Sequence, residues 1–286
     1  MLPTFVIGLR EGLEAALIVG IVAAFLRQRG RSDALRLVWI GVFLAVGACA
    51  LVAVGLQLFS ASLPQAQQEL LETIVGVVAV AMVTYMIVWM RRNSRGLKHE
   101  LEAAASSALA TGTAWALIGM AILAVLREGF ETAVFLLAAF NASGSPVAAG
   151  IGALLGIVAA SVIGYGIYRG GVRINLNRFF RVTGVVLVLV AAGLLATAVH
   201  TAHEAGLIAF GQSQVADLTW IMQPGSVVTA LLTSVLGIQP RPTAIETVAW
   251  LVYLVPMLVV VLWPAPKRPS APREATSAPV VAARES

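Results

Sequence analysis

Seven apolar runs, each about long enough to cross a lipid bilayer as a helix, constrain this chain more than any other feature. They lie at residues 3–26, 37–59, 69–90, 112–140, 147–168, 182–206 and 245–263. A helix of about 20 apolar residues spans the hydrocarbon core. Lipid offers the backbone no hydrogen-bond partners, so such runs favour the helix, which satisfies its own polar groups. The sequence therefore predicts an all-α polytopic membrane protein with seven transmembrane helices.

Charged residues are scarce, which agrees with that class. They make up 12% of the chain, against 59% hydrophobic residues, whereas a soluble domain carries about 25% charged residues. A net charge of +5 would favour nucleic acid as a partner of a soluble chain. Here the basic residues fall in short loops, where they indicate topology, and we expect no nucleic-acid partner. The single cysteine, Cys49, excludes an internal disulfide and a multi-cysteine metal site.

The basic residues gather on one side of the predicted membrane. Four follow the first run, four follow the third, four follow the fifth and four lie in the C-terminal tail, whereas Arg241 is alone in a loop on the other side. Basic loops stay in the cytoplasm. This pattern predicts an external N-terminus and a cytoplasmic C-terminus. We expect a permease domain over residues 1–263 and a disordered cytoplasmic tail over 264–286, which is rich in Pro, Ala, Ser and charge.

Two of the apolar runs contain the same cluster of charges, at residues 9–14 and 126–131. Acids at i and i+3 on a helix face the same way. The first and fourth runs cross in opposite directions, so helices 1–3 and 4–6 are predicted to form an inverted repeat, with the seventh helix added. Transporters with inverted repeats place a polar site near the bilayer midplane. We expect the charged residues of the two clusters to meet there: Arg10, Glu11 and Glu14 with Arg127, Glu128 and Glu131.

These charges cannot face lipid, because each costs about 2.5–3.5 kcal/mol near the centre of a spanning helix. Two arginines pair with two of the four acids and leave two negative charges over. A multivalent cation or protons must neutralise the remainder. Oxygen ligands suit Mg²⁺, Ca²⁺, Mn²⁺ and Fe³⁺. The alternative is a set of Arg–Glu pairs that only hold helices together.

Small residues recur every fourth position in the first and fifth runs, which is typical of closely packed membrane helices. The two stripes are Gly8, Gly12, Ala16 and Gly20, and Gly152, Gly156, Ala160 and Gly164.

A second group of polar residues lies at the predicted outer ends of the third and sixth helices. It comprises Glu69, Glu72, His200, His203 and Glu204. Such residues can stabilise helix ends and make interfacial hydrogen bonds, or they can form an outer vestibule that gathers a cation. Thr243 and Glu246 fit a capping box at the start of the last helix. Within the outer loop, residues 226–238 are too short to span and predict an interfacial or re-entrant helix.

The Arg-Glu-Gly-Leu-Glu and Arg-Glu-Gly-Phe-Glu sequences resemble the paired motif of the oxidase-dependent iron permeases, the bacterial EfeU-type and fungal Ftr-type transporters. The resemblance implies that Glu11, Glu14, Glu128 and Glu131 are ligands on the path of a transported iron ion, together with Arg10 and Arg127. It implies a bacterial inner-membrane protein surrounded by lipid, with no permanently bound cofactor. It also implies periplasmic ferroxidase- or peroxidase-type and iron-binding partners.

Other functions remain open at this point. Members of the resembled family with other metal preferences, lead among them, share the motif, so lead or manganese is an alternative cargo. An intramembrane Mg²⁺-dependent prenyltransferase would also use acidic clusters, although those enzymes usually hold Asp-rich loops at a membrane face. A purely structural membrane subunit is the third alternative. We expect a transporter and not an enzyme.

Overall fold

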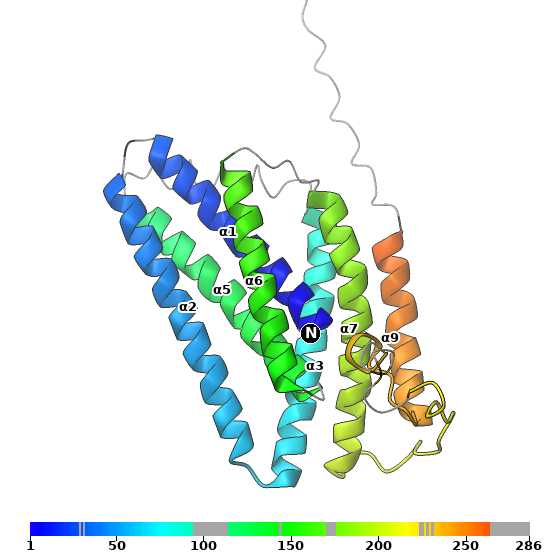
Figure 1. Ribbon diagram of the computed structural model, residues 1–286. Coiled ribbons are helices and arrows are strands. Elements are labelled where there is room, and N and C mark those ends of the chain that lie inside the picture. Colours follow the sequence, from blue (N-terminus) through cyan, green and yellow to red (C-terminus); the bar gives the residue numbers. More distant parts are fainter. Residues whose placement is uncertain are drawn as a thin grey trace, which may run out of the picture.

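The computed structural model describes residues 1–28, 30, 32–93, 114–142, 145–169, 176–222, 226, 229 and 232–263. Within these residues the chain forms seven α-helices, one short π-helix and no strand (Figure 1). The helices are α1 (Leu2–Gln28), α2 (Ser32–Ala61), α3 (Gln65–Asn93), α5 (Ala114–Asn141), α6 (Pro146–Tyr168), α7 (Leu176–Glu204) and α9 (Ala244–Leu262), with the π-helix η1 at Leu232–Leu236. The predicted all-α class and the seven predicted helices are confirmed.

Most helices extend beyond the apolar runs that predict them. Helix α7 begins at Leu176, six residues before the predicted start, and α2 begins at Ser32. Hydropathy marks only the apolar part of a helix, whereas backbone hydrogen bonding continues through flanking polar residues such as Arg178 and Arg181. The predicted tail at 264–286 lies outside the described residues, as do parts of the basic loops at 94–113 and 170–175.

Five helices are long and apolar enough to cross a membrane by length and composition: α2, α3, α6, α7 and α9. Helices α1 and α5 are as long, at 27 and 28 residues. They differ because each carries one arginine and two glutamates within its apolar run. The two long helices with three charges inside their apolar runs are therefore the ones that need shielding by the others.

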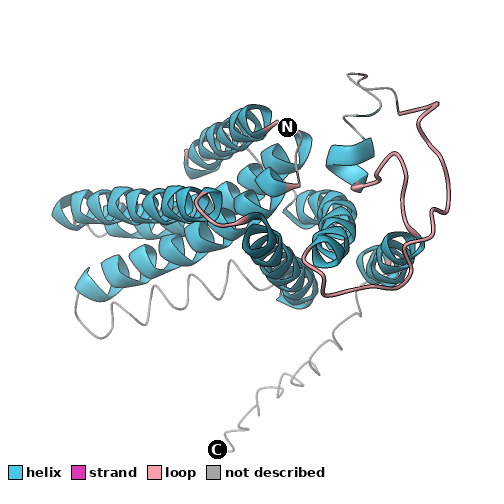
Figure 2. Cartoon of the chain, turned by 90° about the horizontal axis from the view of Figure 1, so that it is seen from below, coloured by secondary structure: helices cyan, strands magenta, loops and turns pink. Residues whose placement is uncertain are grey.

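The arrangement provides that shielding by packing α1 against α5, with the other helices around this pair (Figure 1; Figure 2 gives the view from below). Helix α6 packs along α1, and α2 packs along α5. Helices α3 and α7 pack together, α7 also contacts α1, α3 also contacts α5, and α9 lies against α7. The upper end of the bundle in Figure 1 holds the C-terminal ends of α1, α3, α6 and α9. It also holds the N-terminal ends of α2 and α7.

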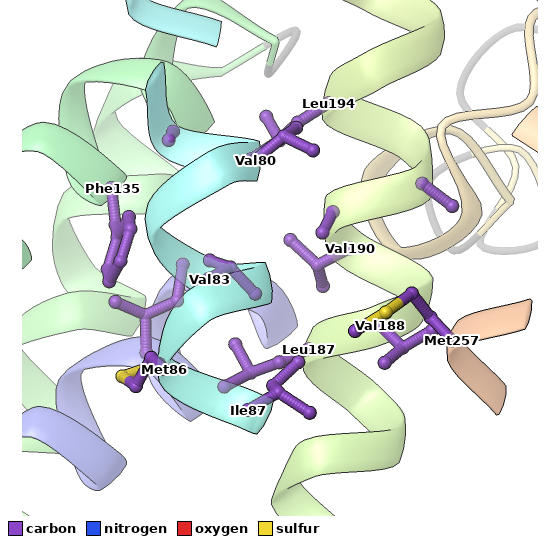
Figure 3. Packing of buried hydrophobic residues seen from close by; sticks show 14 of the residues in the cluster. Val80, Val83, Met86, Ile87, Phe135, Leu187, Val188, Val190, Leu194 and Met257 are labelled. Atoms are coloured by element: carbon purple, nitrogen blue, oxygen red, sulfur yellow. The ribbon is translucent and has the colours of Figure 1, made fainter. Parts of the chain in front are cut away.

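Two apolar cores flank the charged helices. The larger one joins α3, α7, α9 and parts of α1 and α5, with Val83, Phe135 and Leu187 among its buried side chains (Figure 3). The smaller one joins α1, α2 and α5 through Val22, Val38 and their buried neighbours. The charged motifs lie between these cores and are held in place by both.

The predicted stripes of small residues on α1 and α6 face each other. A Cβ atom built on Gly8 would lie 2.6 Å from the Ala153 carbonyl oxygen, and one on Gly12 would lie 2.9 Å from the Ala160 Cβ. A Cβ on Gly156 would collide with the Phe5 carbonyl oxygen. The backbones of α1 and α6 approach this closely only because those positions lack side chains.

The loop after α7 returns to the bundle through specific backbone contacts. Gly211, at φ +75°, accepts a hydrogen bond from Ile245 N (3.1 Å), and Trp250 Nε1 donates to Leu236 O (2.7 Å). Gly237 follows η1 and contacts Gly193 in the middle of α7. The π-helix is the described part of the predicted helix at 226–238; most of the earlier half of that segment lies outside the described residues.

Candidate functional site

The two charged motifs meet where α1 and α5 pack together. Carboxylate oxygens of Glu11, Glu128 and Glu131 all lie within 4.8 Å of one another. Glu11 and Glu128 are buried, and Glu131 is half-buried. The i,i+3 spacing on α5 turns both of its acids toward α1. Three oxygen ligands from two helices thus converge at one point, which we name the carboxylate cluster.

Glu14 lies beside the cluster and is paired with Arg10. The distance from Arg10 Nε to Glu14 Oε1 is 3.4 Å, and the Arg10 side chain is only 2% exposed. The same guanidinium donates a hydrogen bond of 2.7 Å from Nη2 to the thioether sulfur of Met90 on α3. A thioether sulfur is a weak acceptor, so this hydrogen bond offsets little of the free-energy cost of burying the Arg10 charge.

Arg127 on α5 has a different environment, although its motif is nearly the same. Its Nε donates to Glu131 Oε1 at 3.1 Å and lies 3.5 Å from Glu128 Oε1. Its side chain is 58% exposed. The guanidinium carbon lies 6.0 Å from the ring centre of Trp89 on α3, at the limit of a cation–π contact. One arginine of the pair is therefore enclosed, and the other faces an opening.

Several buried polar atoms of the site have no hydrogen-bond partner among the described residues. They are both oxygens of Glu11, one oxygen each of Glu14 and Glu128, and Nε and Nη1 of Arg10. Buried polar groups in proteins are normally paired, and an unpaired cluster indicates a bound ion or water. Glu11 is the acid that neither arginine pairs with, and both of its oxygens belong to this set.

A cavity of about 220 Å³ adjoins the cluster. Its walls come from α1, α3 and α5: Glu14, Tyr85, Met86, Trp89, Arg127 and Glu131. Trp89 is four residues from the end of α3 at Asn93, so the cavity lies toward that end of the bundle. Glu131 belongs to both the cluster and the cavity wall, and it connects the two.

The whole permease region of the chain matches known proteins. Residues 1–265 match the Iron permease FTR1 family. The chain is 40% identical over 287 residues to "Ferrous iron permease EfeU" of Yersinia pestis, with 100% of this chain and 99% of the relative covered. It is 41% identical to the protein of that name from Escherichia coli O6:K15:H31, over 92% of this chain and 96% of the relative.

The chain belongs to the iron permease FTR1 family. Together with the five long apolar helices, this membership makes it a multi-pass membrane protein. No solved structure matches the chain. Among the residues of this family member that were predicted to form the site, three glutamates form the cluster, whereas Glu14 and both arginines line its edge.

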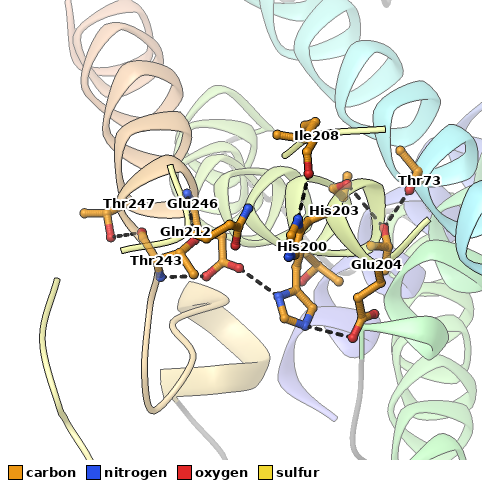
Figure 4. A network of polar contacts seen from close by, with 12 residues as sticks. Thr73, His200, His203, Glu204, Ile208, Gln212, Thr243, Glu246 and Thr247 are labelled. Atoms are coloured by element: carbon orange, nitrogen blue, oxygen red, sulfur yellow. Dashed lines mark hydrogen bonds and ion pairs between the residues drawn. The ribbon is translucent and has the colours of Figure 1, made fainter. Parts of the chain in front are cut away.

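The outer group of predicted residues does not form a single cluster. His200 contacts Glu204, with Nε2 and Oε1 3.4 Å apart (Figure 4). His203 turns to the following loop, where Nδ1 lies 2.6 Å from the Ile208 carbonyl oxygen. Glu69 and Glu72 accept hydrogen bonds from glutamines one turn earlier, Gln65 at 2.9 Å and Gln68 at 3.1 Å.

Sequence reasoning missed three contacts of this FTR1 family member. Met90 accepts from Arg10, Trp89 lies over Arg127, and Glu246 bonds His200. The capping box predicted for Thr243 and Glu246 is confirmed, but nothing near Glu246 in the sequence indicates its second partner. All three contacts join residues on different helices, which a one-dimensional pattern does not reveal.

Proposed function

We propose that this protein carries iron into the cytoplasm across the bacterial inner membrane, by way of the carboxylate cluster. The observation that carries the proposal is the convergence of Glu11, Glu128 and Glu131 within 4.8 Å. Burial of three acids at this distance is costly without a positive charge between them. The arginines supply only part of it: Arg127 pairs with Glu131 and Glu128 from a largely exposed position, whereas Arg10 pairs with Glu14 at the edge.

The ligand chemistry suits an iron ion as cargo. Carboxylates bind Fe²⁺, Fe³⁺ and Mn²⁺. The relatives named ferrous iron permease favour Fe²⁺ among these. No atom of the cluster is a thiolate, so the site is not suited to retain Cu(I). Three protein oxygens leave other coordination positions to water, which allows the ion to be released.

We also propose that all seven helices span the membrane and that α1–α3 and α5–α7 form an inverted repeat. The inverted repeat would relate α1 to α5, α2 to α6 and α3 to α7. The main helix contacts follow this relation: α1 packs against α6 as α5 packs against α2, and α1 contacts α7 as α5 contacts α3. The motif glycines obey the same exchange. A Cβ on Gly12 would meet Ala160 of α6, and one on Gly129 would meet Cys49 of α2 at 2.6 Å.

Orientation follows from the basic loops. The helix ends beside these loops gather at one end of the bundle (Figure 1), and that end is cytoplasmic by the positive-inside rule. The N-terminus is then external. The cavity beside Trp89 opens toward the cytoplasmic end and provides the exit for iron from the cluster. At the external side, periplasmic ferroxidase- or peroxidase-type and iron-binding proteins would deliver the ion, and lipid surrounds the apolar faces.

Uptake of ⁵⁵Fe into proteoliposomes made with the purified full chain tests this function. Ascorbate keeps the iron as Fe²⁺ in one arm, and a ferric chelate supplies Fe³⁺ in the other. We expect uptake that depends on the protein, that competing Mn²⁺ or Pb²⁺ reduces, and that Glu128→Gln abolishes. The matched control is Asp217→Asn, which removes an acid from the outer loop far from the cluster. Equal uptake by liposomes with and without protein would reject the proposal.

A further inference from the structure

His200 on α7 lies between two carboxylates from different parts of the chain (Figure 4). Its Nδ1 is 2.8 Å from Glu246 Oε1 on α9, and its Nε2 is 3.4 Å from Glu204 Oε1 at the end of α7. The Glu246 side chain is 5% exposed, whereas His200 and Glu204 are 41% and 46% exposed. One carboxylate is therefore enclosed behind the imidazole, and the other is accessible beside it.

The capping box fixes the enclosed carboxylate. Thr243 N donates to Glu246 Oε2 at 3.1 Å, and Glu246 N donates to Thr243 Oγ1 at 3.4 Å. Oε2 is thus engaged by the backbone and Oε1 by His200. An ionised carboxylate can only accept, so Nδ1 of His200 carries a hydrogen. Nε2 faces Glu204, a second carboxylate that can only accept, so it carries a hydrogen while no metal ion is bound, and a metal ion that binds Nε2 displaces this hydrogen.

This is the arrangement found around metal-bound histidines, where a carboxylate holds the other ring nitrogen and so fixes the tautomer. We propose that His200 Nε2 and the Glu204 carboxylate bind an incoming iron ion at the outer end of the bundle, with Glu246 as the positioning residue. The assignment of this end as external rests on the proposed function. Water supplies the remaining ligands, and a site with two protein ligands releases its ion readily.

A nitrogen ligand here gives the permease a selectivity that the carboxylate cluster lacks. Clustered oxygens alone also accept Ca²⁺ and Mg²⁺. Imidazole prefers iron and other transition metals to these ions. The outer pair therefore selects iron before the ion reaches the cluster. The other outer residues have separate contacts: His203 bonds a backbone carbonyl, and Glu69 and Glu72 bond glutamines.

Glu246→Gln tests the inference while it keeps the helix cap. The side-chain oxygen of Gln must accept from Thr243 N, as Gln does in a capping box. Its NH₂ group then faces His200 and donates to Nδ1, which leaves the ring hydrogen on Nε2 alone. The ligand nitrogen is blocked, although shape and cap remain. Loss of such a supporting carboxylate weakens metal binding by about 10–100-fold.

The measurement is ¹⁵N NMR of the full chain in detergent, labelled at histidine, which occurs three times in the sequence. Anaerobic Fe²⁺ is the probe. In the unchanged protein we expect His200 to carry a hydrogen on Nδ1 and to give signals that Fe²⁺ broadens. In Glu246→Gln the hydrogen is on Nε2 alone, and broadening needs at least ten times more Fe²⁺. His203 is the internal control, because its Nδ1 faces a carbonyl that does not change.

Two results would overturn the inference: a His200 signal in the unchanged protein that Fe²⁺ does not broaden, or a Glu246→Gln variant with the same tautomer and the same Fe²⁺ dependence. Uptake gives a second readout. Half-saturation by Fe²⁺ should rise about tenfold in His200→Gln and Glu246→Gln, with stronger inhibition by Ca²⁺, and not in Asp217→Asn. The proposed function is tested separately from this inference. Glu128→Gln should remove uptake without changing the His200 signals.

Discussion

Replacing Glu11 with glutamine should raise the stability of the iron-free protein while it removes transport. At 4.8 Å and an effective dielectric constant of about 20, two ionised carboxylates repel each other by at least about 3.5 kcal/mol. Glu11 takes part in two such pairs, with Glu128 and with Glu131. The substitution removes both pairs, so with all three acids ionised it relieves at least about 7 kcal/mol. Protons taken up by the empty cluster relieve part of this repulsion in the unchanged protein.

The opposite response is expected from Arg10→Gln. Arg10 is enclosed and pairs with Glu14 at 3.4 Å. Its removal leaves that acid buried without a counter-charge, which costs about 3–5 kcal/mol. Two neighbouring substitutions of similar size, each removing one charge, should therefore change stability in opposite directions. A role of Glu11 in holding helices together predicts a loss of stability in both.

Thermal unfolding of the full chain in detergent, with and without anaerobic Fe²⁺, measures the difference. Without iron, we expect a higher melting temperature for Glu11→Gln than for the unchanged protein, and a lower one for Arg10→Gln. Iron at 100 times its dissociation constant should stabilise the unchanged protein by about 2.7 kcal/mol and Glu11→Gln much less. A Glu11→Gln variant that melts lower, or one that takes up ⁵⁵Fe normally, would refute the reasoning.

Two further predictions concern packing and topology. Gly156→Leu should prevent folding, because a side chain there meets the backbone of α1. Gly150→Leu, on the same helix with open space around it, should change the free energy of unfolding by less than about 1 kcal/mol. In a chain with Cys49→Ala, a membrane-impermeant thiol reagent applied outside cells should label Ser62→Cys and not Arg169→Cys. Labelling of Arg169→Cys in intact cells would contradict the proposed orientation and the inverted repeat with it.

The helices and the meeting of the motifs were accessible from the sequence for physical reasons. Apolar runs of spanning length leave the backbone little choice but a helix. Three charges in such a run cannot remain in lipid, so α1 and α5 had to face other helices, and the shared Arg-Glu-Gly-x-Glu spacing indicated that they face each other. The stripes on α1 and α6 predicted close approach, and the contact between Gly8 and Ala153 shows which helices approach.

Contacts between residues far apart in the sequence could not be predicted in this way. Met90 is 80 residues from Arg10, and Glu246 is 46 residues from His200. An apolar Met in a membrane helix and a Glu in a capping box are both ordinary residues at their positions. Neither one therefore indicates a second partner on another helix. The helix ends were missed for a different reason. Polar flanking residues end an apolar run but do not end a helix, and α7 accordingly begins before Arg178.

The two motifs also show what a sequence repeat leaves undecided. Under a strict two-fold relation between the repeats, Arg10 would turn to α3 and Arg127 would turn to α7. Instead both guanidiniums reach consecutive residues near the end of α3: Arg10 donates to Met90, and Arg127 lies over Trp89. Near-identical motifs therefore sit in unequal surroundings, one enclosed and one beside a cavity of about 220 Å³. Because the motif sequences are so alike, they cannot favour one end of the bundle over the other. The unequal surroundings of the two arginines therefore come from α3, which contacts both of them.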